Sequence, residues 1–355
     1  MQQFMGVNNF VWWHGVVEDN KDPLKLGRCR VRIFGFHSEN RNELSTESLP
    51  WAHPMQPITN PSISGIGRSP TGVLQGSHIF GFFRDGLDAQ QPCMLGTFGG
   101  IPQIGPEDRG FNDPQLRYPL EESTFWNSTV GEQDTNRLAR AEILDKTIVQ
   151  TKKDIVHKEI PVANSTDTWE EPETSYDARY PYNHVFQSEI GHVIEIDDTP
   201  DAKRLHVYHA AGTFQEIHPD GAKVEKIVHD NYKLVLGSDY VHVTGNVNLI
   251  VGATAEGEDP KSNITILVRG NADLQVDGDA NAFVGKDMYA NVTGNMESNV
   301  EGIYSVDAKK EICLHSDSNV IVNTEKKLTM KAKEGIDILC PEGPVNIKGS
   351  PVNLN

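Results

Sequence analysis

The sequence lacks several features that mark common classes of protein. Its 355 residues include four cysteines, which lie far apart without a CxxC motif, so neither a disulfide framework nor a zinc ribbon is indicated. No apolar stretch approaches the ~20 residues of a membrane helix. The first residues also lack the basic and then apolar layout of a signal peptide. We therefore expect free thiols in a protein that is made in the cytoplasm.

Basic charge is also scarce. The chain has 32 Lys and Arg against 50 Asp and Glu, a formal net charge of -18, and no basic run. Phosphate binding needs clustered Lys and Arg, so nucleic acids and anionic membrane surfaces are disfavoured as steady partners. The acidic excess instead predicts a soluble, exposed surface.

An eight-residue pattern runs through the last third of the chain. Valine recurs at every eighth position from Val268 to Val300, and four of these five valines are followed two places later by glycine. Only Val284 breaks the pattern, because Gly285 comes one place early. Each octad is predicted to be a strand of about six residues that ends in a tight turn with positive φ. The predicted corner glycines are Gly270, Gly278, Gly294 and Gly302.

The period continues in two further apolar rows after the glycines stop. One row begins at Ala272 and the other at Leu274. Residues two apart in a strand share a face, so the three rows form one dry face. The predicted core residues are Val268, Ala272, Leu274, Val276, Val284, Val292, Val300, Val306, Ile312, Leu314, Val320, Val322, Leu328, Met330, Ile336 and Ile338.

Octads of this kind cannot enclose a core within one chain. A solitary β-solenoid needs ~20 residues or more per coil, and a single ladder leaves strand edges and an apolar face open to aggregation. Three chains wound about a common axis remove every edge. We therefore predict a homotrimeric, triple-stranded β-helix over residues 179–355, with regular octads over residues 264–340. Its apolar end is expected to need a capping protein.

The first hundred residues have the pattern of a small β-barrel. Runs rich in β-branched and aromatic residues, at 10–17, 29–36, 77–84 and 94–98, alternate with turn clusters. Roughly five strands are enough for a closed barrel of the OB type. We predict an OB-fold domain over residues 1–105. One of Trp12 and Trp13 should face its core, and the other is assigned to a protein interface rather than to base or sugar stacking.

Residues 106–178 have the composition of a linker, rich in Pro, Asn, Asp, Glu, Ser and Thr. Within them, Leu138, Ala141, Leu144 and Ile148 stand at helical spacing and predict one short helix over residues 134–155. The predicted fold class is all-β, with an N-terminal OB barrel and a C-terminal intertwined trimeric β-helix joined by an irregular linker.

Several short motifs together resemble a known family. The motifs include Asp22-Pro-Leu-Lys-Leu-Gly-Arg28, Leu49-Pro-Trp51, Leu95-Gly-Thr-Phe-Gly-Gly100, Asp197-Asp-Thr-Pro200 and the Val-x-Gly-Asn octads. Over residues 8–118 and 176–355 the chain resembles the central spike proteins of contractile, T-even-type phage baseplates, which are related in architecture to the VgrG spike of type VI secretion. The resemblance implies a virion protein of the tail baseplate. Its barrel would dock on a hub protein, a PAAR-like protein would cap its tip, and sheath contraction would drive it through the host outer membrane.

The linker is where the chain departs from this family. The best-known members carry a muramidase domain between barrel and shaft, and a lysozyme fold needs well over ~100 residues. The linker is shorter, and its acidic residues have little apolar support: Glu121, Glu122, Glu132, Asp134 and Glu142. The resemblance therefore implies a spike without enzymatic activity. Two alternatives are a spike with cell-wall hydrolase activity in the linker and an effector-carrying spike of type VI secretion.

Two patterns in the sequence could indicate metal sites. His206 and His209 are three apart on a predicted strand, so they should point to opposite faces. Cys340 lies in the row of Val268, so three thiols would meet on the axis of a trimer, where packed thiols are favoured over a metal ion. No catalytic, cofactor-binding or metal-binding residues are predicted.

Overall fold

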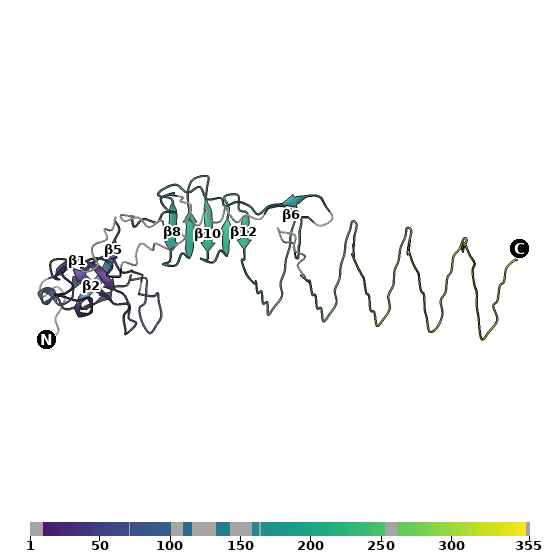
Figure 1. Ribbon diagram of the computed structural model, residues 1–355, viewed down its shortest axis with the longest axis horizontal. Coiled ribbons are helices and arrows are strands. Elements are labelled where there is room, and N and C mark those ends of the chain that lie inside the picture. Colours follow the sequence, from purple (N-terminus) through teal and green to yellow (C-terminus); the bar gives the residue numbers. More distant parts are fainter. Residues whose placement is uncertain are drawn as a thin grey trace. The chain divides into compact units, whose positions relative to one another are not determined.

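The computed structural model describes residues 10–70, 72–100, 109–115, 133–142, 158–162, 165–252 and 262–352 (Figure 1). Their regular structure is almost entirely β, and the two helical elements among them are short 3-10 turns at Thr46–Ser48 and Gly86–Asp88. The predicted all-β class is confirmed. The chain separates into two units, Met1–Leu267 and Val268–Asn355. The described residues include no helix that has the length and apolarity to span a bilayer.

A closed barrel forms the N-terminal part, as predicted. Its strands are β1 (Val11–Asp19), β2 (Cys29–Ile33), β3 (Trp51–Pro54), β4 (His78–Phe83) and β5 (Pro92–Phe98). They pair in the order β1-β2-β3-β5-β4, β3 and β5 are parallel, and β4 closes the barrel against β1. Alternating residues of these strands fill the core, including Trp13, Val31, Ile79 and Phe83.

One carboxylate organises the loop between β1 and β2. Asp22 accepts hydrogen bonds from the backbone N–H of Leu24 at 3.0 Å and of Leu26 at 2.9 Å, and from the Arg28 guanidinium at 2.7 Å. The hydrogen bond from Arg28 holds the pKa of the Asp22 carboxyl well below its usual range. Gly27 has a φ of +74°, and a Cβ there would meet Pro70 at 2.4 Å. The motif from Asp22 to Arg28 therefore shapes a loop.

A buried ion pair ties the start of the predicted linker to the barrel. Both side chains of Glu18 and Arg32 are 0% exposed, and Arg32 Nε lies 2.6 Å from Glu18 Oε1. The Glu18 carboxylate also accepts hydrogen bonds from the Thr46 hydroxyl at 2.8 Å and from the backbone N–H of Phe111 at 3.1 Å. The Phe111 ring stacks on Phe34 with centroids 4.1 Å apart. Residues 109–115 thus pack on the barrel.

The described part of the predicted helix over residues 134–155 is not helical. Residues 137–141 form a turn in which Glu142 N donates to the Arg137 carbonyl at 3.0 Å, and residues 143–155 lie outside the described residues. Leu138 is instead 4% exposed in a core cluster that it shares with the following sheet. Its carbonyl accepts the Tyr176 hydroxyl at 2.7 Å and Asn183 Nδ2 at 3.2 Å. Tertiary contacts therefore use the carbonyl that a helix would require.

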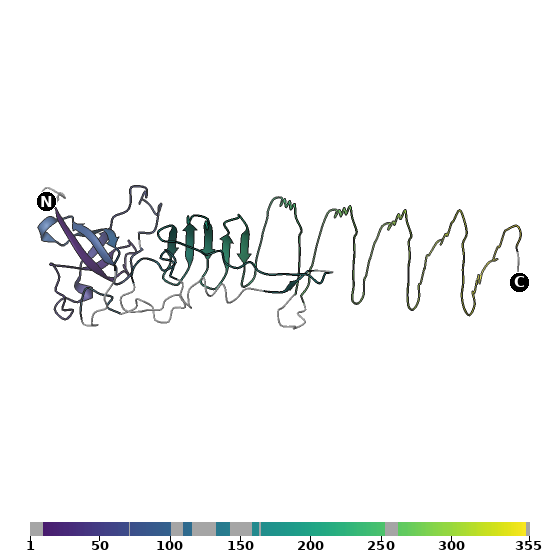
Figure 2. The same cartoon turned by 90° about the horizontal axis from the view of Figure 1, so that it is seen from above.

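A second sheet follows a small two-stranded pairing of β6 (Ile160–Pro161) with β7 (Thr168–Trp169). Its strands are β8 (Asn183–Gln187), β9 (Val193–Asp197), β10 (Arg204–Tyr208), β11 (Phe214–Ile217) and β12 (Lys223–Lys226). Neighbours along the chain pair antiparallel (Figure 2). The predicted intertwined region began at residue 179, but these residues pair within one chain because short turns join each strand to the next.

Candidate self-association surface

Beyond β12 the chain is extended and bends at regular intervals. Bends lie at 228–229, 236–237 and 244–245, and then at every eighth residue from 269–270 to 333–334. In both Figure 1 and Figure 2, residues 268–352 wind as an open coil. The bends therefore begin about 40 residues before the predicted octads. The signal that sequence reasoning missed is the same Val-x-Gly motif at Val235 and Val243.

The octad changes phase between the bends at 244–245 and 269–270, and a further bend at 251–252 comes seven residues after the first of these. The bends that begin at residues 244 and 269 are 25 residues apart, which is one residue more than three octads. The sequence indicated this shift, because residues 252–263 interrupt the alternation of apolar residues. The apolar rows shift together with the bends, since Val243 and Val268 each directly precede a bend.

The corners differ from the prediction in their backbone conformation. The predicted glycines occupy the second position of a bend, but none of these four has φ in the left-handed region: Gly270, Gly278, Gly294 and Gly302. A bend of this kind is open to any L-residue. The same position is filled after the glycines stop by Lys310, Ser318, Lys326 and Glu334. The expected positive φ is therefore wrong, and its absence explains why the period outlasts the glycines.

The predicted core residues of the shaft are all exposed in the single chain. The valine row is about half exposed, with Val276 at 47%, whereas Leu274 is 88% exposed. Within residues 230–252 and 262–352, the described backbone forms no hydrogen bond to another part of the chain. The apolar face is thus uncovered within one chain, and the described backbone of the coil has no neighbouring strand there.

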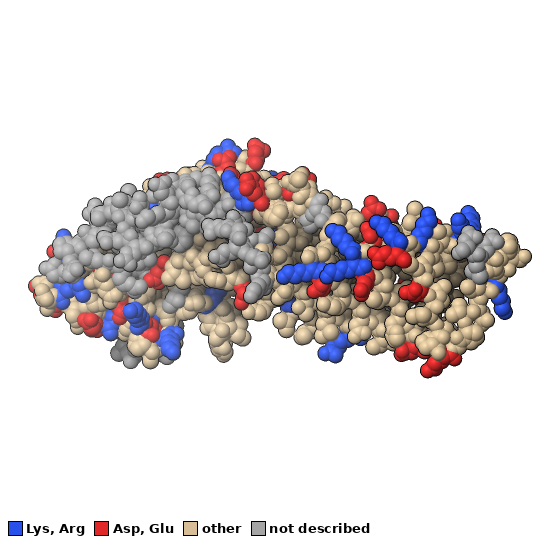
Figure 3. All heavy atoms as spheres, turned by 45° about the vertical axis from the view of Figure 1, so that its right-hand side comes forward, with Lys and Arg blue, Asp and Glu red and all other residues tan. Residues whose placement is uncertain are grey.

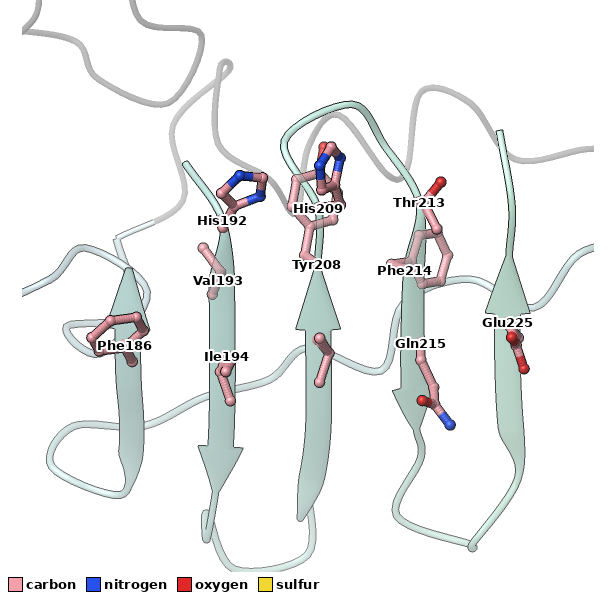
Figure 4. A pocket seen from close by; sticks show the side chains of 11 residues that line it. Phe186, His192, Val193, Ile194, Tyr208, His209, Thr213, Phe214, Gln215 and Glu225 are labelled. Atoms are coloured by element: carbon pink, nitrogen blue, oxygen red, sulfur yellow. The ribbon is translucent and has the colours of Figure 1, made fainter. Parts of the chain in front are cut away.

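The five-stranded sheet also has an exposed apolar face. Phe186, Ile194, Ile196, Leu205 and Val207 alternate onto this face and are about half exposed or more. A hollow of about 430 Å³ lies among them, with Phe186, Ile194 and Val207 in its lining (Figure 4). Exposed apolar surfaces of this kind are typical of interaction sites.

The opposite face of the same sheet is charged and buried. Glu195, Arg204, His206 and Glu216 are each no more than 3% exposed. Arg204 Nη2 lies 2.5 Å from Glu195 Oε2, Arg204 Nη1 lies 3.1 Å from Glu216 Oε2, and His206 Nδ1 lies 2.7 Å from Glu195 Oε1. Sequence reasoning missed this cluster, because alternation in these strands does not tell which face is covered. In this sheet the charged side chains are therefore buried and the apolar ones exposed, the reverse of the usual arrangement.

Glu195 should make the sheet sensitive to acid. Burial alone would raise the pKa of its carboxyl, but the hydrogen bond from His206 and the charge of Arg204 together hold that pKa below its usual value. A carboxyl group with a lowered pKa stabilises the folded state above its unfolded pKa, and this contribution is lost as pH falls through the folded pKa. We expect the melting temperature of the sheet, followed by circular dichroism, to fall below about pH 4.3. In Glu195→Gln the fall should be shallower, and an unchanged slope would contradict this role of Glu195.

The barrel carries an exposed cluster that we call the aromatic belt, formed by Trp12, His14, Phe34, Phe80 and Phe98. The Trp12 and Phe80 rings stack with centroids 4.8 Å apart, and Phe98 contacts both Phe80 and His14. Trp12 is 49% exposed whereas Trp13 is 3% exposed, which confirms that one of the two faces the core. Phe80 and Phe98 were not singled out from sequence, because they join the belt only through the pairing of β4 with β1 and β5. Such a patch suits contact with another protein.

The remaining candidate residues do not converge on one site. His206 is buried and His209 exposed, on opposite faces as predicted, and Cys340 is exposed in the single chain. The Asp134 carboxylate accepts the backbone N–H of Gly100 at 2.8 Å, and Glu142 pairs with Arg140 at 2.8 Å. Glu121, Glu122 and Glu132 lie outside the described residues. Within the described ranges, no three His, Cys, Asp or Glu side chains are grouped to hold a metal ion.

Comparison with known proteins identifies relatives of the chain. Residues 35–183 match the Gp5 N-terminal OB domain family. The chain is 43% identical over 279 residues to Protein Gp5 of Vibrio phage KVP40, which covers 70% of this chain and 65% of that protein. It is 46% identical over 118 residues to the pre-baseplate central spike protein Gp5 of Enterobacteria phage T4, which covers 32% of this chain and 20% of that protein. The chain thus spans less than two thirds of either relative. The predicted resemblance to central spike proteins and the predicted OB-fold are both confirmed.

Proposed function

We propose, on the basis of its relationship to the Gp5 proteins of these phages, that the chain forms a homotrimeric central spike in the tail baseplate of a virion. Three copies would wind together through the bends of residues 228–352, so that the apolar rows meet on a common axis. Each copy would supply the neighbouring strands that the backbone of the next copy lacks.

The observation that carries this proposal is the coil itself. Its apolar rows are exposed, and its described backbone forms no backbone–backbone hydrogen bond within the chain. Two interleaved copies would place successive turns of one chain roughly three strand spacings, or about 14 Å, apart along the axis. The apolar face of the β8–β12 sheet adds to the same surface, because it too is exposed only while the chain is alone.

We place the barrel at the attached end of the spike and the coil at the end that pierces the host outer membrane on sheath contraction. The aromatic belt is the surface that we assign to docking on a hub protein of the baseplate. Val345, Ile347 and Val352 remain exposed near the last described residue, so we propose a PAAR-like protein as the cap of the tip. On the face drawn in Figure 3, basic and acidic side chains are interspersed, in keeping with protein partners rather than nucleic acid.

We propose that the spike acts by force and has no hydrolase activity of its own. Of the linker acids, Asp134 and Glu142 are engaged in local contacts with Gly100 and Arg140. A zymogram of the purified full chain on peptidoglycan should therefore show no clearing, beside hen-type lysozyme as a positive control. A cleared band at the position of this chain would favour a spike with cell-wall hydrolase activity.

The trimer is tested by sedimentation of the full chain. We expect a mass three times that of one chain, and a band of that size should persist in detergent until the sample is heated, because interchain strands close every edge. The heated sample is the control for a single chain. A single-chain mass in the unheated native sample would end the proposal.

A further inference from the structure

One segment crosses the whole of the five-stranded sheet on its charged face. Residues 171–179 precede β8 in the chain, yet they contact the strands from the opposite edge onward. Glu171 pairs with Lys226 of β12 at 2.8 Å. Thr174 Oγ1 and Ser175 N donate to the Glu216 carboxylate of β11 at 3.1 and 3.0 Å.

The crossing continues over the remaining strands. The Tyr176 ring lies beneath the Arg204 guanidinium of β10, with the guanidinium carbon 5.0 Å from the ring centroid. Arg179 N donates to the hydroxyl of Thr199, just after β9, at 2.9 Å. The chain then turns into β8. The segment therefore meets β12, β11, β10 and the end of β9 in order, and we call residues 171–179 the strap.

The charged face requires such a cover. Glu195, Arg204 and Glu216 are almost wholly removed from water, and buried charges of this kind are tolerated only when they are paired and their remaining hydrogen-bonding positions are filled. The strap fills those positions on Glu216 with its own hydroxyl and N–H groups. Tyr176 and Ala178 also join Val193, Tyr208 and Phe214 in one core cluster.

We propose that the strap braces the sheet from its charged face and thereby presents the apolar face as a preformed surface to a second copy of the chain. This inference rests on the proposed self-association. Contacts from β12, β11, β10 and the loop after β9 to one common segment hold these strands in one arrangement. The strap lies on the charged face, so it would not itself contact the second copy and would act only by holding the strands in position.

The test uses two readouts on the full chain: amide hydrogen exchange of residues 193–226 and sedimentation. Tyr176→Ala removes the ring beneath Arg204 and should raise exchange in β9 to β11 by more than about tenfold. It should also weaken self-association. Asp177→Ala changes the exposed neighbour in the same strap and is the matched control, which should alter neither readout.

Two milder variants keep the test informative where Tyr176→Ala unfolds the sheet. Tyr176→Phe removes only the hydroxyl bonded to Leu138, and Glu171→Gln removes only the charge that pairs with Lys226, so exchange should rise less and, for Glu171→Gln, mainly in β12.

The outcomes separate the strap from the trimer. Unchanged exchange in the folded variants would overturn the brace, and raised exchange with unchanged self-association would overturn its role in presenting the apolar face. If the unmodified chain sediments as one copy, the trimer fails and the presenting role fails with it, while exchange alone still decides whether the strap is a brace.

Discussion

Val292→Asp should abolish self-association of the chain. Val292 stands in the valine row, about half exposed in the single chain, and in the proposed trimer three copies of it meet at the axis. Three carboxylates would then be buried in a dry core, and the described residues of the valine row include no Lys or Arg to pair with them. Each buried, unpaired charge costs on the order of several kcal/mol, so the combined penalty should exceed the stability of an ordinary assembly. Sedimentation should give the mass of one chain.

Two variants control this experiment. Asn291→Asp adds the same charge one residue earlier, on the opposite face of the strand, and should leave the assembly intact. Val292→Thr keeps the shape of the side chain but adds a hydroxyl, so its effect should be intermediate. If Val292→Asp assembled as well as Asn291→Asp, the valine row would not face the axis.

Glu18→Ala should unfold the barrel or come close to it. The change leaves the Arg32 guanidinium buried without its carboxylate, and breaking one partner of a buried pair costs about 3–5 kcal/mol. It also removes the acceptor of the Thr46 hydroxyl and of the Phe111 N–H. The total approaches the whole stability of a small domain, which is about 5–15 kcal/mol. Urea unfolding followed by tryptophan fluorescence, to which the buried Trp13 contributes, should show the loss.

The exposed pair on the same domain is the control. Glu39 and Arg109 approach to 3.1 Å, but their side chains are 61% and 58% exposed. Exposed pairs contribute about 0–1 kcal/mol, so Glu39→Ala should shift the urea midpoint little. Equal shifts for Glu18→Ala and Glu39→Ala would show that burial does not decide the strength of the Glu18 pair.

Periodic features of the fold could be predicted from the sequence. Valine at every eighth position predicts bends at every eighth residue, and the structure has them. This was predictable because a strand and its corner depend on residues that are close together in the sequence. Four of the five barrel strands were predictable because each is a separate short run between turn residues, whereas β3 (Trp51–Pro54) was not singled out. The corner conformation was not, because glycine permits a positive φ without requiring one.

Contacts between distant residues could not be predicted. The strap depends on Ser175 meeting Glu216, 41 residues later, and no period or motif links the two positions. The alternation of Ile194 and Ile196 with Glu195 predicted a strand. In a sheet with one buried face, the apolar side chains are usually the buried ones. In the single chain the reverse holds here, because Glu195 is buried and the two isoleucines are exposed. The proposed self-association would account for this arrangement, because a second copy would cover the apolar face of the sheet.

The ordinary backbone at the corners has a consequence for how such a shaft changes in evolution. The second bend position is occupied by Gly270 as well as by Lys310 and Glu334, so an additional bend requires no glycine. An in-frame duplication or deletion of one octad keeps every apolar row aligned, whereas a change of one residue inverts the faces beyond it. In the proposed spike, the length of the coil can therefore change in steps of one octad, through duplication or deletion of an existing octad.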